Sequence, residues 1–369
     1  MICRHLSTGS RLCTENGGYD FLAKIKVLII DDSALARELL SKGLSRDPAI
    51  EVIGTAQDVY VARDKIVYLK PDVLTLDVEM PKMDGVEFLR KLMPQYPLPV
   101  VMVSALTAPG AQVTLEALEL GAVDFVLKPS SSFGNRLDEM FQELAQKIKV
   151  AAFVDVSEYR NNRIVQTHES RRHLVGGTDK IIAIGASTGG TVALRKMIEE
   201  FPPNFPATLI VQHMPPKFTK MFADRLNDHA RVSVSEAKDG DRLVTGQVLI
   251  APGGFHMRLK RSGGIYTVKC AEGPPVNGHC PSVDVLFESV ASEAGGNALG
   301  VILTGMGRDG ARGLLQMRES GARTFAQDEA SSVVFGMPKE AFEMGAVDSL
   351  TPLSSMTDAV LRQLEGAKV

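Results

Sequence analysis

The feature that most constrains the fold is a repeated alternation of short apolar runs with longer stretches of helical period. Between residues 24 and 150 each apolar run precedes an amphipathic stretch, and the runs lie at 27–30, 51–53, 73–76, 100–103 and 125–127. Strands that alternate with helices form βα units around a parallel sheet. The pattern predicts a complete doubly wound α/β domain over residues 24–150.

A second series of the same kind follows later in the chain, with apolar runs at 181–184, 208–211, 248–250, 301–303 and 324–326. Between the third and fourth runs, residues 257–270 alternate around Ser262-Gly263-Gly264, which predicts a β-hairpin on an otherwise parallel sheet. We therefore expect a second doubly wound, Rossmann-like α/β domain with a hairpin insertion over residues 180–369.

The remaining segments lack a sustained period. Residues 1–23 are polar and aperiodic, and we expect a disordered tail without a chemical role. Residues 151–179 are polar and contain Gly176-Gly177, as is typical of a linker. The length of 369 residues suits two domains, because single domains commonly have about 100–150 residues.

Composition narrows the class of protein. The 41 basic and 44 acidic side chains give a net charge of −3, which disfavours nucleic-acid binding. Four cysteines without CxxC spacing suit a reducing compartment. No apolar run approaches the roughly 18–20 residues of a membrane span, and no signal peptide is visible. We expect a cytoplasmic protein without membrane insertion.

Charged or hydroxyl side chains follow several strands of the first predicted sheet. Asp31-Asp32 follow the first strand, Asp77 the third, Ser104 the fourth and Lys128 the fifth. The carboxyl ends of parallel strands meet in one crevice, where carboxylate oxygens suit a divalent ion such as Mg²⁺. A hydroxyl and an ammonium beside them could hold a phosphoryl oxygen. The pattern predicts a phosphoacceptor site.

The segments 27–33 (VLIIDDS), 76–85 (LDVEMPKMDG) and Lys128-Pro129 resemble the receiver domain of bacterial two-component response regulators over roughly residues 24–150. The resemblance implies that a partner histidine kinase phosphorylates Asp77, with Asp31 and Asp32 holding Mg²⁺ beside it. It also places Phe125 at the position of the family's aromatic switch residue.

A nucleophile motif opens the second domain. Gly185-Ala186-Ser187-Thr188-Gly189 follows a strand and precedes a helix, the G-x-S-x-G context in which Ser187 would be the nucleophile. A phosphate-binding P-loop is disfavoured because Thr191-Val192 replaces the Lys-Ser/Thr pair. His213 ends the next strand as the best-placed base, and Asp309 follows the 301–303 run as the orienting carboxylate.

Three other interpretations compete. Gly305-x-Gly307-x-x-Gly310, with Asp328 after the next strand, fits a dinucleotide fingerprint, although Arg308-Asp309 would set an acid against the pyrophosphate. A receiver with a DNA-binding output would need a basic recognition helix, which the neutral second domain lacks. A metal cluster of Cys270, His279 and Cys280 would lack the paired spacing of structural zinc sites.

The combined motifs 184–190 (IGASTGG), 211–215 (VQHMP) and 303–310 (LTGMGRDG) resemble the catalytic domain of the chemotaxis protein-glutamate methylesterases, the CheB family. With the receiver, the resemblance covers about residues 24–365 and includes 274–279 and 281–284. It implies hydrolysis of γ-glutamyl methyl esters on chemoreceptors without an esterase cofactor, and deamidation of receptor glutamines. The implied roles are nucleophile, base and orienter for Ser187, His213 and Asp309, an oxyanion-hole amide for Met306, and cleft-lining side chains for Thr188 and His279. Arg308 departs from the family's more usual Asn.

Overall fold

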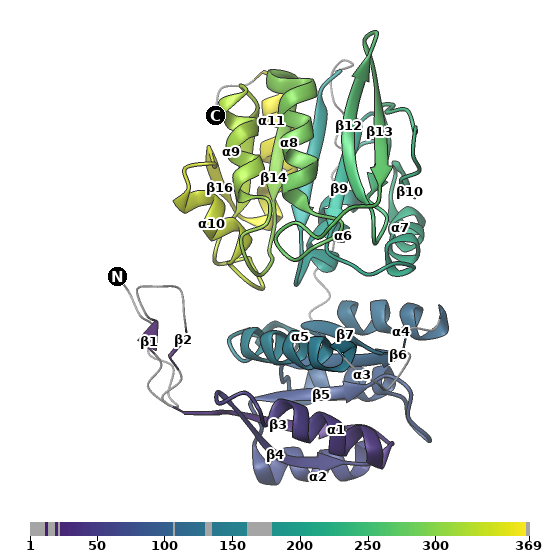
Figure 1. Cartoon of the computed structure of the whole chain (residues 1–369), viewed down its shortest axis with the longest axis vertical. Coiled ribbons are helices and arrows are strands. Elements are labelled where there is room, and N and C mark those ends of the chain that lie inside the picture. The colour runs from purple at the N-terminus through teal and green to yellow at the C-terminus, as the bar shows by residue number, and fades with distance from the viewer. Residues whose placement is uncertain are drawn as a thin grey trace. The chain divides into compact units, whose positions relative to one another are not determined.

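The computed structural model describes residues 12–13, 19–20, 23–105, 108–129, 135–160 and 179–366. The chain divides into two compact units, residues 1–163 and 164–369. Each unit is an α/β fold around a parallel sheet, which confirms the predicted fold class (Figure 1).

Unit 1 is built on a five-stranded parallel sheet in the order β4-β3-β5-β6-β7. All five strands predicted from the apolar runs are present: β3 (Ile25–Ile30), β4 (Ile50–Ala56), β5 (Val73–Asp77), β6 (Val100–Ala105) and β7 (Asp124–Lys128). The central strands β3, β5 and β6 are almost wholly buried, as expected for a sheet that is covered on both faces.

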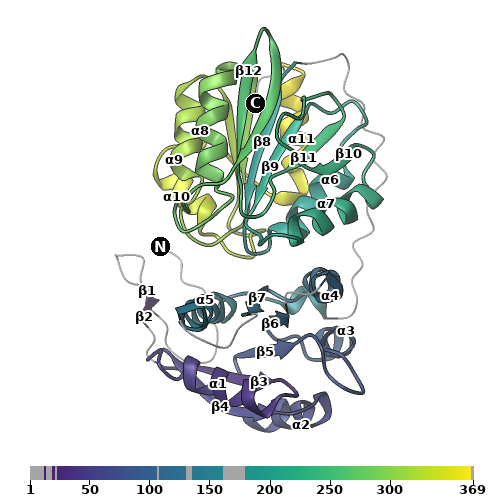
Figure 2. The same cartoon turned by 45° about the vertical axis from the view of Figure 1, so that its right-hand side comes forward.

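Helices cover both faces of this sheet. α1 (Ala34–Leu44) packs against α5 (Asn135–Ala151) on one face, and α3 (Gly85–Gln95) packs against α4 (Ala108–Glu119) on the other (Figure 2). α2 (Val59–Leu69) contacts β3 and β4. Side-chain caps fix where helices begin: Ser33 accepts from Ala36 N, and Asp58 accepts from Tyr60 N and Val61 N.

Unit 2 contains a seven-stranded parallel sheet in the order β10-β11-β9-β8-β14-β15-β16. Its strands are β8 (Ile181–Ala186), β9 (Thr208–Gln212), β10 (Ser233–Glu236), β11 (Gln247–Ile250), β14 (Ala298–Ile302), β15 (Arg323–Gln327) and β16 (Ser349–Thr351). The sequence predicted five of these and missed the two edges, β10 and β16, because their residues alternate with serine and threonine.

Two helical layers enclose the sheet of unit 2. On one face lie α8 (Val283–Ala294), α9 (Ala311–Glu319) and α10 (Met337–Glu343), with α8 and α9 packed side by side (Figure 2). On the other lie α6 (Gly190–Glu199), α7 (Phe218–His229) and α11 (Leu353–Leu364). A short 3₁₀ turn, η2 (Gly295–Asn297), leads from α8 into β14.

The predicted hairpin is present, but it is not part of the main sheet. β12 (His256–Ser262) and β13 (Ile265–Ala271) form a separate antiparallel sheet that packs against α8. Ser262 pairs with Ile265, so Gly263-Gly264 form the two-residue turn with φ of 54° and 83°. The buried side chains Met257, Leu259 and Val268 explain the packing, because they give the hairpin one apolar face.

The terminal and connecting segments differ from the sequence expectation. β1 (Leu12–Cys13) and β2 (Tyr19–Asp20) form a two-residue antiparallel ladder within the stretch expected to lack structure, and the other residues before Ala23 lie outside the described part. α5 extends to Ala151, and a 3₁₀ turn, η1 (Ser157–Tyr159), follows buried Val156. Part of the expected 151–179 linker is thus folded with unit 1, because it carries apolar side chains. The domain bounds stay a prediction.

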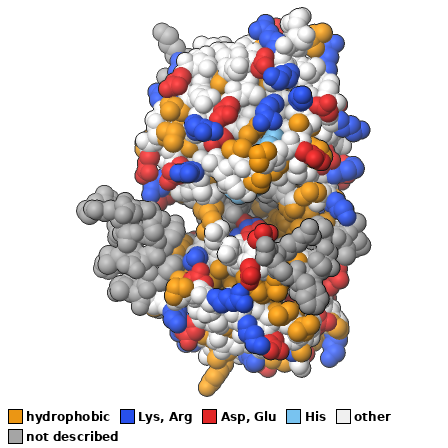
Figure 3. Space-filling view, viewed as in Figure 1, with side chains coloured by type: hydrophobic (Ala, Val, Ile, Leu, Met, Phe, Trp, Pro, Cys, Tyr) orange, Lys and Arg blue, Asp and Glu red, His pale blue; other side chains and the backbone are white. Residues whose placement is uncertain are grey.

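Two features concern the described part of the chain as a whole. No helix in the described ranges is both long enough and apolar enough to cross a bilayer. The face seen in Figure 3 shows basic and acidic side chains interspersed over both units. Such a mixture follows from nearly equal numbers of the two charges.

Candidate functional site

The carboxyl edge of the first sheet brings together the acids and the lysine that the sequence singled out. Asp77 ends β5, Asp31 follows β3, and Lys128 ends β7. The Lys128 ammonium donates to Asp31 Oδ2 and to Asp77 Oδ2, both at 2.8 Å. Both carboxylates are buried, whereas Asp32 is exposed at the same edge.

This cluster carries more negative charge than Lys128 neutralises. Burial raises the pKa of Asp77 to about 6; the nearby Lys128 opposes this rise, and Asp31 adds to it. Lys128 is itself half-buried, which lowers its pKa, but attraction to Asp77 and Asp31 produces a net rise. Oxygen atoms of Asp31, Asp32 and Asp77 all lie within 4.8 Å of one another. An all-oxygen donor set of this charge suits a hard divalent cation such as Mg²⁺.

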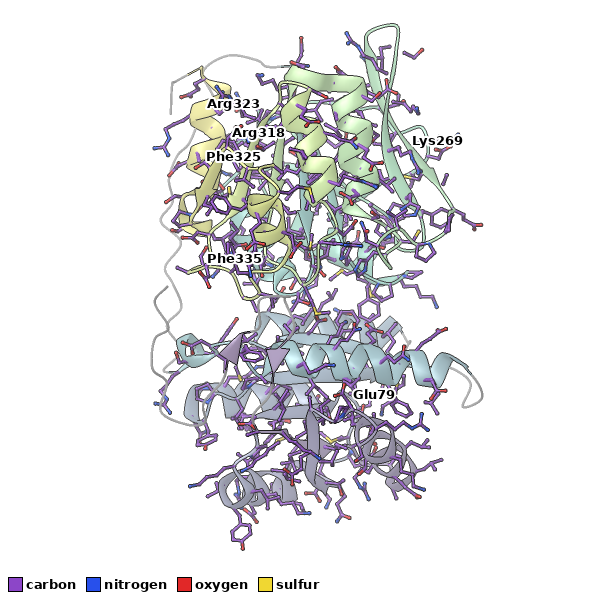
Figure 4. The ribbon with its side chains drawn as sticks, turned by 60° about the vertical axis from the view of Figure 1, so that its left-hand side comes forward. Glu79, Lys269, Arg318, Arg323, Phe325 and Phe335 are labelled. Carbon is purple, nitrogen blue, oxygen red and sulfur yellow. The ribbon has the colours of Figure 1, made fainter. Side chains whose placement is uncertain are left out.

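A tight loop holds Asp77 at the edge of a pocket. Gly85 N donates to Val78 O at 3.0 Å, and Asp84 caps α3 by accepting from Glu87 N. A Cβ on Gly85 would collide with the Asp77 carbonyl oxygen, so this fold-back requires glycine. Glu79, labelled in Figure 4, lines the pocket with Asp77 and Lys128.

Ser104 and Phe125 lie in the strands beside this pocket. Ser104 is fully buried near the end of β6, next to the β5 strand that ends in Asp77, and its Oγ accepts from Thr114 Oγ1 at 2.8 Å. Phe125 is buried in β7, with the Lys147 ammonium 5.4 Å from its ring centroid. The structure thus brings Asp31, Asp77, Ser104 and Lys128 to the carboxyl edge of the sheet, whereas Phe125 lies toward the amino end of β7.

In unit 2 the three candidate catalytic residues follow three adjacent strands. Ser187 follows β8, His213 follows β9, and Asp309 lies in the turn after β14. Backbone bonds continue the sheet pairing past the strand ends: His213 N donates to Ala186 O at 3.1 Å, and Ser187 N donates to Thr304 O at 3.0 Å. These bonds hold Ser187 between the segments that carry His213 and Asp309.

His213 and Asp309 form a direct hydrogen bond, with Nε2 and Oδ2 2.8 Å apart. Burial tends to raise the pKa of Asp309, but the hydrogen bonds from His213, Asn277 and Val283 N outweigh it and hold that pKa well below its usual range. The carboxylate is therefore ionised and can only accept, so Nε2 of His213 carries the proton. Nδ1 of His213 is buried without a hydrogen-bond partner among the described residues, which leaves a lone pair available.

The remaining predicted cleft residues gather at the same edge. The His279 ring stacks on His213, with centroids 3.7 Å apart and an interplanar angle of 12°. Thr188 is buried, and its carbonyl accepts from Thr304 Oγ1 at 3.0 Å. Met306 is half-buried in the turn after Gly305, and Arg308 is exposed.

The loop after β15 supports the turn that carries Met306 through backbone hydrogen bonds. Gly305 donates to Val334 O at 3.1 Å and accepts from Met337 N at 2.8 Å. Phe335 lies in this loop at the carboxyl end of the sheet, and Arg323 lies at the amino end of β15 (Figure 4). The loop therefore fixes the backbone that carries Met306.

Comparison with known proteins identifies the family. Residues 182–360 match the CheB methylesterase family, and residues 27–141 match the response regulator receiver domain. The protein-glutamate methylesterase/protein-glutamine glutaminase of Syntrophotalea carbinolica is 60% identical over 351 residues, which are 94% of this chain and 99% of that protein. The chain belongs to the CheB methylesterase family.

Other proteins are also similar to this chain. A protein of the same name from Sulfurimonas denitrificans is 54% identical over 90% of this chain and 96% of its own length. The crystal structure of the Thermotoga maritima CheB methylesterase catalytic domain is 38% identical, with a TM-score of 0.49, over 51% of this chain and 100% of that chain.

The competing dinucleotide interpretation is not favoured. The carboxylate of Asp309, inside the glycine-rich turn, is 1% exposed and accepts from Val283 N at 2.7 Å. The turn therefore already holds a buried acid where a dinucleotide fingerprint would hold a pyrophosphate. Asp328 accepts from Ser331 N and Ser331 Oγ, which makes it a local cap rather than a ribose ligand. The match to the CheB methylesterase family agrees with this geometry.

Sequence reasoning missed residues that surround Asp309. Ser282 Oγ donates to Asp309 Oδ1 at 2.8 Å, and Asn277 Nδ2 donates to the same oxygen at 2.8 Å. Asp284 is buried beside them. Two sequence signals were available: Asn277-Gly278 is a hairpin-turn dipeptide, and Ser282 occupies an N-cap position before an apolar run.

Proposed function

We propose that Ser187, His213 and Asp309 carry out the reactions after which the relatives are named. These are hydrolysis of γ-glutamyl methyl esters and deamidation of glutamine side chains, here on the cytoplasmic domains of chemoreceptors. The single observation that carries the proposal is the His213–Asp309 pair, which leaves the lone pair of Nδ1 buried and unpaired at the strand end beside Ser187.

The chemistry follows the serine-hydrolase pattern. The Ser187 hydroxyl adds to the ester carbonyl carbon while Nδ1 of His213 takes its proton, and Asp309 stabilises the resulting imidazolium. The imidazolium then protonates the departing methoxide, which leaves as methanol and gives an acyl-enzyme. Water hydrolyses the acyl-enzyme through the same base. With a glutamine substrate the leaving group is ammonia.

The other cleft residues would stabilise and align the reacting group. The backbone amide of Met306 would donate to the oxyanion, a contribution that is commonly worth a few kcal/mol. Thr188 and His279 would line the cleft. The hydrolysis needs no cofactor, because the nucleophile, base and orienting acid all come from the chain.

Asp77 would accept a phosphoryl group from a partner histidine kinase and thereby activate the hydrolase. Asp31, Asp32 and Asp77 fit Mg²⁺ by their oxygen donors and close spacing. When bound, the ion would offset charge on the transferring group. Lys128 and Ser104 would hold phosphoryl oxygens, and Phe125 would respond as the switch aromatic. We propose a cytoplasmic location, without nucleic-acid partners or membrane insertion.

The test is methanol release from methylated receptor, with and without a small acyl phosphate as phosphodonor. Ser187→Ala should lower the rate by orders of magnitude, because the nucleophile is lost. Asp77→Asn should retain the basal rate but lose the stimulation by phosphodonor. The exposed variants Ser320→Ala and Asp64→Asn serve as matched controls and should behave as wild type. Normal turnover by Ser187→Ala would overturn the proposed catalytic site, and stimulation retained by Asp77→Asn would place the acceptor elsewhere.

A further inference from the structure

A tight turn presents two side chains to the His213–Asp309 pair. Val276 and His279 exchange two backbone hydrogen bonds of 3.0 Å, with Asn277 at φ 52° and Gly278 at φ 83° between them. Positive φ at both central residues defines a type I′ turn, in which Asn-Gly is strongly preferred. His279 stacks on the His213 ring, and Asn277 reaches the carboxylate behind it.

The Asn277 amide bridges two buried acids. Nδ2 lies 2.8 Å from Asp309 Oδ1 and 2.8 Å from Asp284 Oδ2. Both partners are carboxyl oxygens, which fixes the orientation of the amide with the nitrogen toward them. The two N–H groups of Nδ2 are thus divided, with one for each acid.

Other donors also contact these two buried acids. Asp309 and Asp284 are 1% and 3% exposed. Asp309 faces His213 and the start of α8, where Ser282 Oγ, Val283 N and Asp284 N donate to it. Asp284 accepts from Gly313 N in α9 at 2.7 Å.

The surroundings of Asp284 raise its pKa above the ordinary value. Burial raises the pKa of Asp284, and the charge of Asp309 adds to the rise. Gly313 N, Asn277 and the more distant Arg312 oppose it. Arg312 is exposed and forms an ion pair with Glu288, so its charge is largely screened from the buried pair.

We propose that Asn277 is a positioning residue for ester hydrolysis: its amide bridges Asp309 and Asp284, so that Oδ2 of Asp309 stays aligned with Nε2 of His213. Asn277 acts through Asp309 and does not touch the reacting atoms. The inference rests on the proposed function, because it assigns Asn277 to the alignment of the same base.

The decisive variant is Asn277→Asp in the full chain. Aspartate has the same shape and tolerates positive φ, but it replaces both N–H donors by a third carboxylate. We expect kcat to fall by about tenfold to a hundredfold, the loss typical of a hydrogen bond to a charged group, with KM changed less than about twofold. The acid limb of the kcat/KM profile should move to higher pH, because an added negative charge favours the protonated imidazole.

Two further variants separate alignment from folding. Asn277→Gly removes the amide without adding charge. It should lower kcat but move the acid limb less than Asn277→Asp does. Adding Asp284→Asn to Asn277→Asp returns the number of carboxylates to two and should recover part of kcat. The control is Asn227→Asp in α7, an exposed residue whose Oδ1 accepts from Val234 N, a bond that aspartate can keep; it should behave as wild type.

A second measurement is independent of activity. The downfield proton NMR signal of His213 Nε2–H, assigned by its loss in His213→Gln, should weaken or shift in both Asn277 variants. Wild-type kcat, acid limb and NMR signal in folded Asn277→Asp would overturn the proposal, as would a lower melting temperature without a shift of the limb or the signal. If wild type releases no methanol, the proposed function fails, and the NMR signal still decides the role of Asn277.

Discussion

Two buried aspartates in this chain behave in opposite ways because their partners differ. Asp309 accepts from five donors, those of His213, Asn277, Ser282, Val283 and Asp284, and its pKa is held well below the usual range. Asp77, where burial dominates and the main hydrogen-bond donor is Lys128, has a pKa raised to about 6. The first suits a permanently charged orienting group, and the second reflects a buried carboxylate whose charge Lys128 only partly offsets.

The raised pKa of Asp77 predicts how receiver stability depends on pH. The folded state binds the Asp77 proton more tightly than the unfolded chain, so stability falls as pH rises from about 4 to about 6. The change from 3.8 to about 6 corresponds to at most about 3 kcal/mol. Asp77→Asn should lack this fall. Hydrogen exchange of β5 amides between pH 4 and pH 7 measures this fall in stability, with the exposed variant Asp64→Asn as the control.

Magnesium provides the opposite test of the same cluster. Added Mg²⁺ should slow exchange of β5 amides in wild type at pH 7, because a cation offsets the crowding of Asp31, Asp32 and Asp77. The effect should be much smaller in Asp77→Asn. Equal protection in both proteins would contradict the assignment of Asp77 to the cation site.

At the level of elements, apolar periodicity predicted the buried strands and failed at the edges. β8 and β9 are apolar on both faces, so short hydrophobic runs locate them, whereas β10 and β16 pair on one side only and alternate with polar residues. The strand-end rule predicted that Ser187, His213 and Asp309 would converge. It could not predict Asn277, which arrives from a turn between the hairpin and α8, because long-range loop placement leaves no periodic signal.

The close packing of α8 and α9 connects element geometry to the candidate active site. A Cβ on Gly313 in α9 would lie 2.6 Å from Phe287 Cβ and 3.0 Å from the Asp284 carbonyl oxygen of α8. Gly313→Ala should therefore push apart the helices that hold Asp284 and lower stability by about 1–3 kcal/mol. It should also slow hydrolysis. Thermal melting and methanol release measure both effects, and stability equal to that of exposed Glu319→Ala would refute the packing argument.

At the scale of the whole molecule, the residues proposed for each reaction lie within one compact unit, on that unit's own sheet. Every residue proposed for hydrolysis lies between Ser187 and Asp309, and every residue proposed for phosphorylation lies between Asp31 and Lys128. The two proposed sets of residues do not overlap, so we expect phosphorylation to change hydrolysis by shifting an equilibrium between a less active and a more active state. A shift of tenfold requires about 1.4 kcal/mol of phosphorylation-linked free energy.

A fragment of residues 179–369 tests this arrangement. It contains the seven-stranded sheet, both helical layers and the hairpin, so we expect it to fold and release methanol with no response to phosphodonor. If the unphosphorylated receiver favours the less active state, the fragment should be faster than the unphosphorylated chain, because deletion removes that bias. The control is full-length Asp77→Asn, which should keep the slow basal rate. A folded fragment that is slower than the unphosphorylated chain would mean that the receiver itself promotes hydrolysis. Phosphorylation would then strengthen this positive effect instead of removing an inhibitory one.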